Sequence, residues 1–233
     1  MAAFGLIIGA LVLAAIFGPQ FWIKHVMRRH GKDRTDLPGT GGELAQHLVD
    51  HYQLRGVGVE ETDLGPHYDS DARMVRLTPD IMRGRSLTAV AVATHEVGHA
   101  LQHADGLDGL PDGGLMRRQR LVKAVVSIDR LASIFFLAAP ILGALARTPA
   151  AFFGFIAVGI GLLAIRLVVH LITLPVEYDA SFQRALPLLK HGGYLEEDDL
   201  PAVRSVLKAA ALTYVAAAAM SLLDLARWIR IIR

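Results

Sequence analysis

Long apolar segments constrain the fold of this chain more than any other feature of its sequence. Residues 2–23 carry no charge and are long enough to cross about 30 Å of hydrocarbon as one helix. Residues 131–174 contain two charges, Arg147 and Arg166, and are too long for a single crossing. A last apolar segment covers residues 209–232. We therefore expect a mainly α membrane protein with about four transmembrane helices.

These segments divide the sequence into five predicted parts. The first is a retained anchor and not a cleaved signal peptide, because its basic residues follow the apolar run. The break at Arg147-Thr148-Pro149 makes a helical hairpin of the middle segment. The predicted parts are a transmembrane anchor (1–23), a polar module (24–126), a transmembrane hairpin (127–174), a second polar segment (175–208) and a C-terminal transmembrane helix (209–233).

Charge indicates an orientation and excludes some partners. Most Lys and Arg residues lie between residues 24 and 130, so the positive-inside rule places both polar segments in the cytoplasm of a multi-pass cell-membrane protein. The positive-inside rule fits less well at the C-terminus, because four crossings would place Arg227, Arg230 and Arg233 outside. The last helix either crosses fully or ends at the interface. A net charge of +2 gives no basic field for nucleic acid. No cysteine is present, which excludes disulfides and thiolate metal sites.

The polar module has the periodicity of an α+β unit. Residues 41–54 predict an amphipathic helix, residues 57–60 a strand and residues 67–77 a β-hairpin with a polar turn. Ser86 is placed to cap a helix over residues 87–103. Asp199 and Pro201 are predicted to start the last helix.

Residues 95–99 read His-Glu-Val-Gly-His, the HExxH pattern. Two histidines four residues apart project from one helical face, close enough to hold one Zn²⁺ ion per chain. Glu96 beside them can take a proton from water that the ion activates. The helix is apolar on nearly every face and should be buried, where an unpaired glutamate beside two histidines would be costly without a metal.

Zinc needs a third ligand, for which the sequence offers three candidates. His103 would lie ~12 Å along the helix axis from His95, which is far for a bond of ~2 Å. Asp105 has the metzincin offset, but Gln102 stands where those enzymes turn the chain at a glycine. Glu177 is favoured, because a carboxylate from a second helix completes a His₂Glu site. Asp179 could orient a ligand histidine or stabilise a helix start.

For the other ionisable groups we favour roles outside a metal site or an active site. His47 and His51 flank Asp50 in an inverted pattern, but they lie on the polar face of their helix, so solvation is favoured over a metal site. Arg166, His170 and Asp224 fall in apolar segments, where pairing between helices is favoured over a role in an active site.

Four segments together carry a family resemblance: AVAVATHEVGHALQ, PHYDSDARMVRLTP, LPVEYDAS and LKAAALTYVAAA. The chain resembles the YugP-like membrane zinc metallopeptidases over nearly its whole length, with kinship to the HtpX-like gluzincins. The resemblance implies that His95 and His99 bind zinc, that Glu96 is the general base and that Glu177 is the third ligand. It differs from the HtpX-like Glu-x-x-x-Asp arrangement, because Ser181 stands at the last position and leaves Asp179 as the substitute.

The expected function is a membrane-embedded zinc endopeptidase whose site lies at the cytoplasmic membrane surface. Its substrates would be polypeptides, including membrane-associated ones, and no oligomeric state is indicated. His67, Tyr68 and Tyr214 are unranked candidates for stabilising the oxyanion, and residues 74–77 could pair with an extended substrate. The alternatives are a membrane scaffold or binding protein with a structural metal site, and a transporter built on Arg166, His170 and Asp224.

Overall fold

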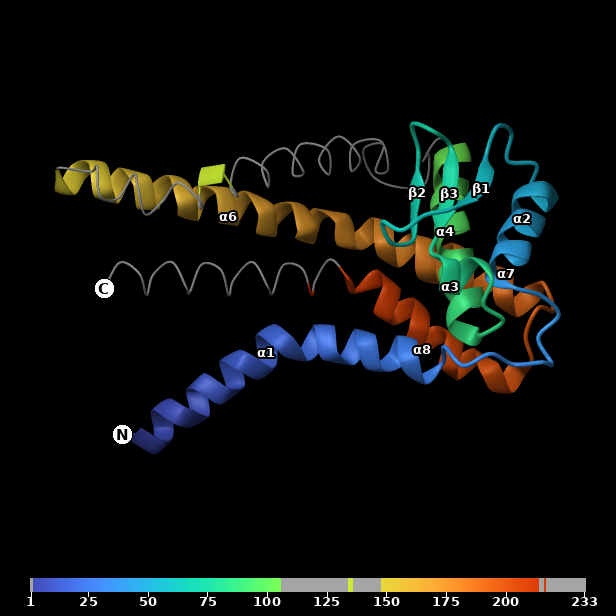
Figure 1. Cartoon of the computed structure of the whole chain (residues 1–233), viewed down its shortest axis with the longest axis horizontal. Helices are drawn as coiled ribbons and strands as arrows, with labels where there is room; N and C mark the ends of the chain where they lie inside the picture. The colour runs from blue at the N-terminus through green and yellow to red at the C-terminus, as the bar shows by residue number, and fades with distance from the viewer. Residues whose placement is uncertain (1, 106–133, 136–147, 214–215, 217–233) are drawn as a thin grey trace. The chain divides into compact units, whose positions relative to one another are not determined.

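The computed structural model describes residues 2–105, 134–135, 148–213 and 216 (Figure 1). The chain forms two compact units. One comprises Met1–Pro19, Arg117–Thr173 and Tyr214–Arg233; the other, here the site unit, comprises Gln20–Met116 and Leu174–Thr213. Helices α1 (Ala2–Arg29) and α6 (Pro149–Tyr178) contribute residues to both units.

The chain is mainly helical with a small sheet, but the prediction of about four transmembrane helices is wrong. Within the described residues, no helix is long and apolar enough to cross a membrane. The helix boundaries differ from the predicted ones as well, since α1 continues through Lys24 to Arg29 and α6 continues through Pro175 to Tyr178. Residues 127–146 and 209–232 lie almost wholly outside the described part. The predicted cytoplasmic orientation has no support in the structure, and the five-part boundaries stay predictions.

A three-stranded sheet forms in the site unit, with β3 between β1 and β2. Strands β2 (His67–Asp69) and β3 (Met74–Leu77) pair antiparallel, which confirms the predicted hairpin. The turn between them is closed by Asp69, whose Oδ1 accepts hydrogen bonds from the backbone N–H groups of Asp71 and Ala72. Strand β1 (Gly58–Glu61) adds in parallel to β3, a pairing that local sequence did not indicate.

The central position of β3 corrects one expectation. Its residues pair with β1 on one side and β2 on the other, so the arm at residues 74–77 has no free edge for an extended substrate. The prediction that this arm pairs with substrate is therefore wrong. The free edges of the sheet belong to β1 and β2.

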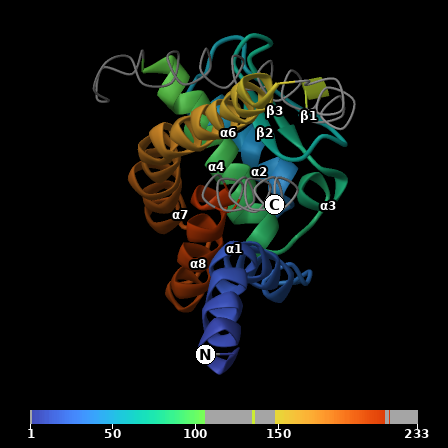
Figure 2. The same cartoon turned by 90° about the vertical axis from the view of Figure 1, so that its left-hand side faces the viewer.

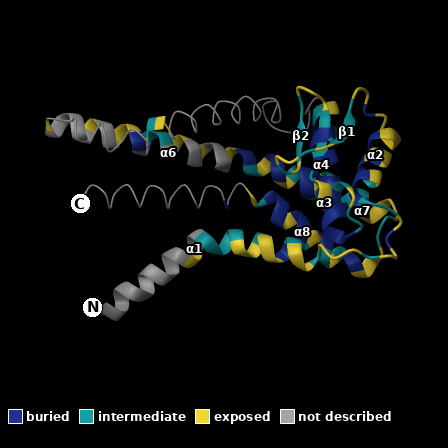
Figure 3. Cartoon of the chain, in the orientation of Figure 1, coloured by how far each residue is buried: buried dark blue, intermediate teal, exposed yellow. Residues whose placement is uncertain are grey.

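Helix α4 (Leu87–Ala104) is the centre of the site unit. It begins as predicted at Ser86, whose Oγ accepts a hydrogen bond of 3.1 Å from the N–H of Ala89. Every residue from 87 to 100 is buried, as the apolar surround of the helix predicts (Figure 3). Around it pack α2 (Gly41–His51), α3 (Pro79–Met82), the strands β2 and β3, and the helices that follow α6 (Figure 1 and Figure 2).

The segment after α6 is a seven-residue π-helix, η1 (Asp179–Ala185), which packs along α4. It leads into α7 (Leu186–His191), a short 3₁₀ turn η2 (Glu197–Asp199) and α8 (Leu200–Ala211). Asp199 immediately precedes α8, where a helix start was predicted, but its side chain forms no capping hydrogen bond. Its carboxylate is paired with Arg34, which ties the segment after α1 to the start of α8.

The backbones of α4 and η1 approach closely at Gly98, inside the HExxH pattern. A Cβ added at Gly98 would lie 2.7 Å from the carbonyl oxygen of Ala180. Real Cβ atoms do not make such contacts, and a backbone oxygen cannot rotate away as a side chain can. Glycine at this position therefore permits the spacing at which residues of η1 reach the histidines of α4.

Gly98→Ala should lower the free energy of unfolding by about 1–3 kcal/mol, because overpacking outweighs the gain in helix propensity. Gly154→Ala is the matched control, since Gly154 is also helical but nothing lies within 4 Å of its added Cβ. Urea unfolding of the metal-free chain measures both. Equal stability of Gly98→Ala and the wild-type protein would contradict the close approach.

Candidate metal centre

Three buried residues from two helices converge in the site unit. His95 and His99 lie one turn apart on α4, and Glu177 lies in the last turn of α6. The Oε2 atom of Glu177 is 3.2 Å from Nε2 of His95 and 3.3 Å from Nε2 of His99. One potential ligand atom from each residue lies within 4.8 Å of the others, and this is the one such group of three within the described residues.

Ser181 fixes the orientation of the His95 ring. Its Oγ lies 3.0 Å from Nδ1 of His95 and donates to the carbonyl oxygen of Leu207 at 3.2 Å. A hydroxyl has one hydrogen, so Ser181 must accept the hydrogen bond from His95. The proton of a neutral His95 is therefore on Nδ1, and Nε2 presents a lone pair toward Glu177.

Gln102 fixes the His99 ring in the same way. Its amide nitrogen donates to the carbonyl oxygen of Val176 at 2.9 Å and to Oδ2 of Asp179 at 2.7 Å. Both partners are acceptors, so the amide cannot be reversed, and its oxygen faces Nδ1 of His99 at 2.8 Å. His99 must donate from Nδ1, which leaves the lone pair of Nε2 for Glu177 as well.

These residues fit a divalent metal ion. Two imidazole lone pairs and a carboxylate oxygen repel one another in a buried site unless a cation lies among them. One proton can be shared by two of the three atoms, whereas Zn²⁺ binds all three. Two His nitrogens and one Glu oxygen are the protein ligands of catalytic zinc in the gluzincin arrangement, with a fourth position left for water or substrate.

Glu96 lies beside this group without being part of it. Only 6% of the residue is exposed, and its carboxylate has no hydrogen bond to any residue of the described part. Asp199 Oδ2 is the one fully enclosed side-chain oxygen or nitrogen without a partner among the described residues, so the Glu96 oxygens retain access to solvent. A buried carboxylate in this position can accept a proton from a water molecule at the metal centre.

The other predicted residues lie outside the ligand group. Asp179 accepts from Gln102 and Arg184 and does not bind a ligand histidine directly. His67 uses its Nδ1 to donate to the carbonyl oxygen of Gly65 at 2.8 Å. Tyr214 falls outside the described residues, as does Asp224. Of Arg166 and His170, only the helical backbone is described.

The two rejected ligand candidates have other partners. Asp105 caps the C-terminal end of α4 and forms an ion pair with Arg184. His103 lies 2.8 Å, Nδ1 to hydroxyl, from Tyr68 of β2. Burial lowers the pKa of His103 and raises the pKa of Tyr68 to about 12. At neutral pH both groups are therefore uncharged, and Tyr68 retains its proton.

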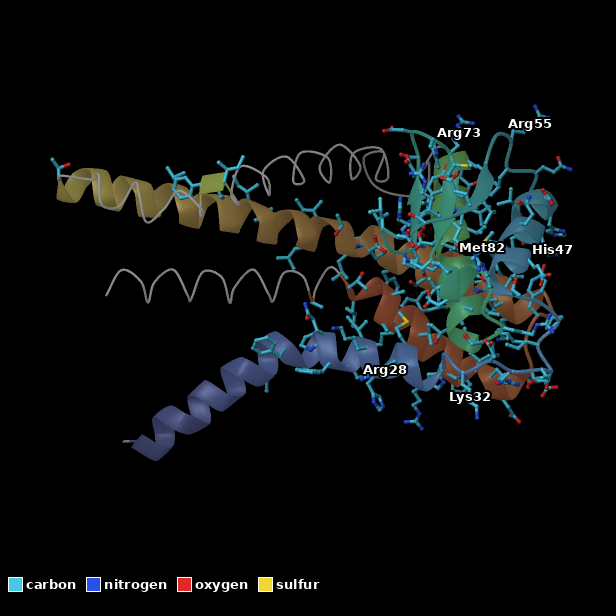
Figure 4. The ribbon with its side chains drawn as sticks, in the orientation of Figure 1. Arg28, Lys32, His47, Arg55, Arg73 and Met82 are labelled. Carbon is cyan, nitrogen blue, oxygen red and sulfur yellow. The ribbon has the colours of Figure 1, made fainter. Side chains whose placement is uncertain are left out.

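The competing histidine pair lies on the exposed face of α2, as predicted. The rings of His47 and His51 are stacked with centroids 5.9 Å apart, and His47 Nε2 is 2.9 Å from the hydroxyl of Tyr194 (Figure 4). No third carboxylate or imidazole of the described chain joins them in a metal-binding group.

Sequence reasoning missed Gln102 and Ser181, whose side chains form hydrogen bonds with Nδ1 of His99 and of His95. Their spacing in the sequence could have indicated both residues. Gln102 lies three residues after His99, and Ser181 four residues after Glu177, so each shares a helical face with a ligand. Polar residues at these offsets are also common without any such role, and only the packing of η1 on α4 distinguishes them.

A buried group of two histidines and one glutamate, with a second glutamate next to it in sequence, is the residue set found in gluzincin-type zinc hydrolases. Residues 5–233 match the model of a family described as "Putative neutral zinc metallopeptidase", and the chain belongs to this family. It is 38% identical over 226 residues to "Putative membrane protease YugP" of Bacillus subtilis (strain 168), covering 95% of this chain and 94% of that protein. No solved structure matches the chain. The predicted family resemblance is thus confirmed.

Glu177→Gln should weaken zinc binding severely while leaving the chain folded. Loss of a partner outside the ligand set already costs about 10–100-fold in metal affinity, so loss of a ligand should cost more. Metal analysis after dialysis against buffered zinc measures the stoichiometry. Glu196→Gln, at an exposed position, and His47→Ala should keep the wild-type stoichiometry. Full zinc content in Glu177→Gln would exclude Glu177 as the third ligand.

Proposed function

We propose that this chain is a zinc-dependent endopeptidase in which His95, His99 and Glu177 hold the metal and Glu96 is the general base. Membership in a zinc metallopeptidase family supports the reaction class. The observation that carries the mechanism is the state of Glu96, a buried carboxylate beside the ligand group that is neither a member of it nor hydrogen-bonded by a described residue. A largely buried carboxylate that keeps access to solvent and has no described hydrogen-bond partner is available to accept a proton from water.

Each residue of the site has a separate role in peptide hydrolysis. When bound, Zn²⁺ polarises the scissile carbonyl and lowers the pKa of the attacking water toward ~7. Glu96 accepts the proton of that water and passes it to the leaving amine. Ser181 and Gln102 hold the two histidine rings, so that both Nε2 atoms remain in place while the proton moves. Burial of the whole group strengthens these electrostatic interactions.

Tyr68 is our candidate for stabilising the oxyanion. His103 lies one turn after His99 on α4, about 6 Å along the axis, and its Nδ1 is within hydrogen-bond distance of the Tyr68 hydroxyl. The phenol stays protonated at neutral pH, because burial raises its pKa to about 12. In the proposal His103 donates from Nδ1 to the Tyr68 oxygen, so the single phenol hydrogen is available to a developing negative charge.

A structural metal site in a scaffold protein is the alternative from a different class. Structural zinc is closed by four protein ligands, whereas catalytic zinc keeps an open position. The candidate group contains three, and no fourth His, Cys, Asp or Glu of the described chain belongs to it. The donor set therefore favours catalysis.

Membrane association is a further part of the proposal. The Bacillus subtilis relative is named a membrane protease. On α1 the exposed Phe21 and Trp22 precede the exposed Lys24 and Arg28, an arrangement suited to a lipid–water interface. Figure 4 shows the Arg28 side chain pointing away from the helix. Cell fractionation tests this, and recovery of the chain entirely in the fraction without membranes would contradict it. Polypeptides at the membrane are then the natural substrates.

Glu96→Gln should keep zinc and lose peptidase activity by about 10²–10⁴-fold, because the amide cannot accept a proton. Zinc content and cleavage of a casein substrate are measured on the same preparation, with Glu196→Gln as the matched control. Wild-type activity in Glu96→Gln, purified free of other proteases, would refute the assigned base.

Tyr68→Phe should keep zinc and lower kcat about 10²-fold, with a smaller change in KM. Tyr52→Phe, at an exposed tyrosine, is the control. Because the pKa of Tyr68 is about 12, ionisation of this phenol should cause no loss of wild-type activity up to roughly pH 10, where an unperturbed tyrosine would titrate. An unchanged kcat in Tyr68→Phe would remove Tyr68 from the mechanism.

A further inference from the structure

The side chain of Gln102 makes three hydrogen bonds, and the fold fixes the partner of each one. The residue is fully buried, and its amide receives a hydrogen bond from His99 while donating to Val176 and Asp179. A buried amide with both donors and its acceptor engaged has one stable orientation, since reversal would set acceptor against acceptor. The amide nitrogen of Gln102 therefore binds two acceptors, on Val176 and Asp179, and its amide oxygen is the acceptor for His99.

Two ion pairs hold the far end of this arrangement. Arg184 of η1 donates from Nε to Oδ2 of Asp179 at 2.9 Å, and its NH1 pairs with Asp105 at the end of α4. The same Oδ2 of Asp179 thus binds both Gln102 and Arg184. Because Arg184 fixes the carboxylate, Asp179 in turn fixes the amide, and the contacts run without a break from Asp105 to His99.

We propose that Gln102 is a positioning residue that sets the tautomer of His99, so that Nε2 meets the metal with its lone pair. The inference rests on the metal site proposed above. Asp179 and Arg184 act through Gln102 and hold its amide in the required direction. Ser181 does the same for His95 from the opposite helix, by a hydroxyl whose single proton is already committed to Leu207.

The chemical consequence is that neutral groups support both ligand histidines. In many zinc sites a carboxylate accepts the imidazole proton directly and makes the ring a stronger donor. Here the charge of Asp179 is separated from His99 by the Gln102 amide, and His95 contacts a hydroxyl. Orientation of the rings is thus obtained without adding a further negative charge to a buried site that already contains the carboxylates of Glu177 and Glu96.

Gln102→Met tests the proposal with little change in side-chain volume. The variant should bind zinc about 10–100-fold more weakly, measured by competition with a chromogenic chelator. Proton NMR of the zinc-loaded chain gives the second measurement. The downfield Nδ1–H resonance of His99 should move or exchange away, while that of His95, which is held by Ser181, should remain. Ser181→Ala should produce the opposite pattern.

Gln46→Met is the matched control, because Gln46 is an exposed helical glutamine that also donates to a carboxylate, Asp50. It should leave zinc affinity and both resonances unchanged. If Gln102→Met fails to fold, Asp179→Asn gives the second test. The new amide at position 179 can accept from the nitrogen of Gln102 or donate to its oxygen, so it no longer fixes one orientation of Gln102. Asp179→Asn should weaken zinc binding by a smaller factor than Gln102→Met does.

A paired exchange separates positioning from general packing. Gln102→Glu alone would place two carboxylates against each other at Asp179. Gln102→Glu combined with Asp179→Asn restores a donor facing an acceptor, and it should bind zinc more tightly than Gln102→Glu alone. Positioning predicts that the rescue restores the His99 Nδ1–H resonance together with zinc affinity, whereas a role in packing alone predicts recovered stability without that resonance.

The outcomes distinguish this inference from the proposed function. A wild-type chain that binds no zinc would overturn the metal site itself. A wild-type chain that binds zinc, together with unchanged affinity and an unchanged His99 resonance in Gln102→Met, would overturn only the role of Gln102. Failure of the double variant to bind more tightly than Gln102→Glu would do the same.

Discussion

Three buried acceptor atoms facing one another are the constraint on which the rest of the site unit depends. His95 and His99 are held with their Nδ1 protons turned outward, so both Nε2 lone pairs meet the carboxylate of Glu177 within about 3.3 Å. A cation at its centre would bind all three atoms and remove their mutual repulsion. The metal would then join α4 to the end of α6, and the affinity for zinc would contribute directly to the stability of the folded chain.

The surrounding helices are arranged to keep that geometry. Gly98 lets η1 approach α4 closely, and the approach brings Ser181 to His95. Asp179 and Arg184, from the same π-helix, hold Gln102. π-Helices often occur at functional sites, and here a seven-residue example begins two residues after the third proposed ligand. One short segment therefore supports both histidines of a different helix.

Local sequence was sufficient for the helix α4, the β-hairpin and the three converging residues. The cap at Ser86, the apolar surround of α4 and the polar turn after Asp69 are decided by neighbours in the chain, and all three were predicted. The parallel pairing of β1 with β3 and the contacts of Gln102 and Ser181 depend on packing between distant segments, which no local pattern contains. The membrane helices were predicted from apolar runs alone, and the helix boundaries do not follow those runs.

X-ray absorption at the zinc edge of the purified, zinc-loaded chain tests the central claim most directly. The account predicts two imidazole nitrogens at ~2.0–2.1 Å and oxygen ligands at ~2.0–2.2 Å, with one oxygen lost in Glu177→Gln. Two imidazoles with an oxygen from Glu177 and an exchangeable water would support the open, catalytic arrangement. A zinc shell with no imidazole, or one unchanged by substitution of His95, His99 or Glu177, would contradict it.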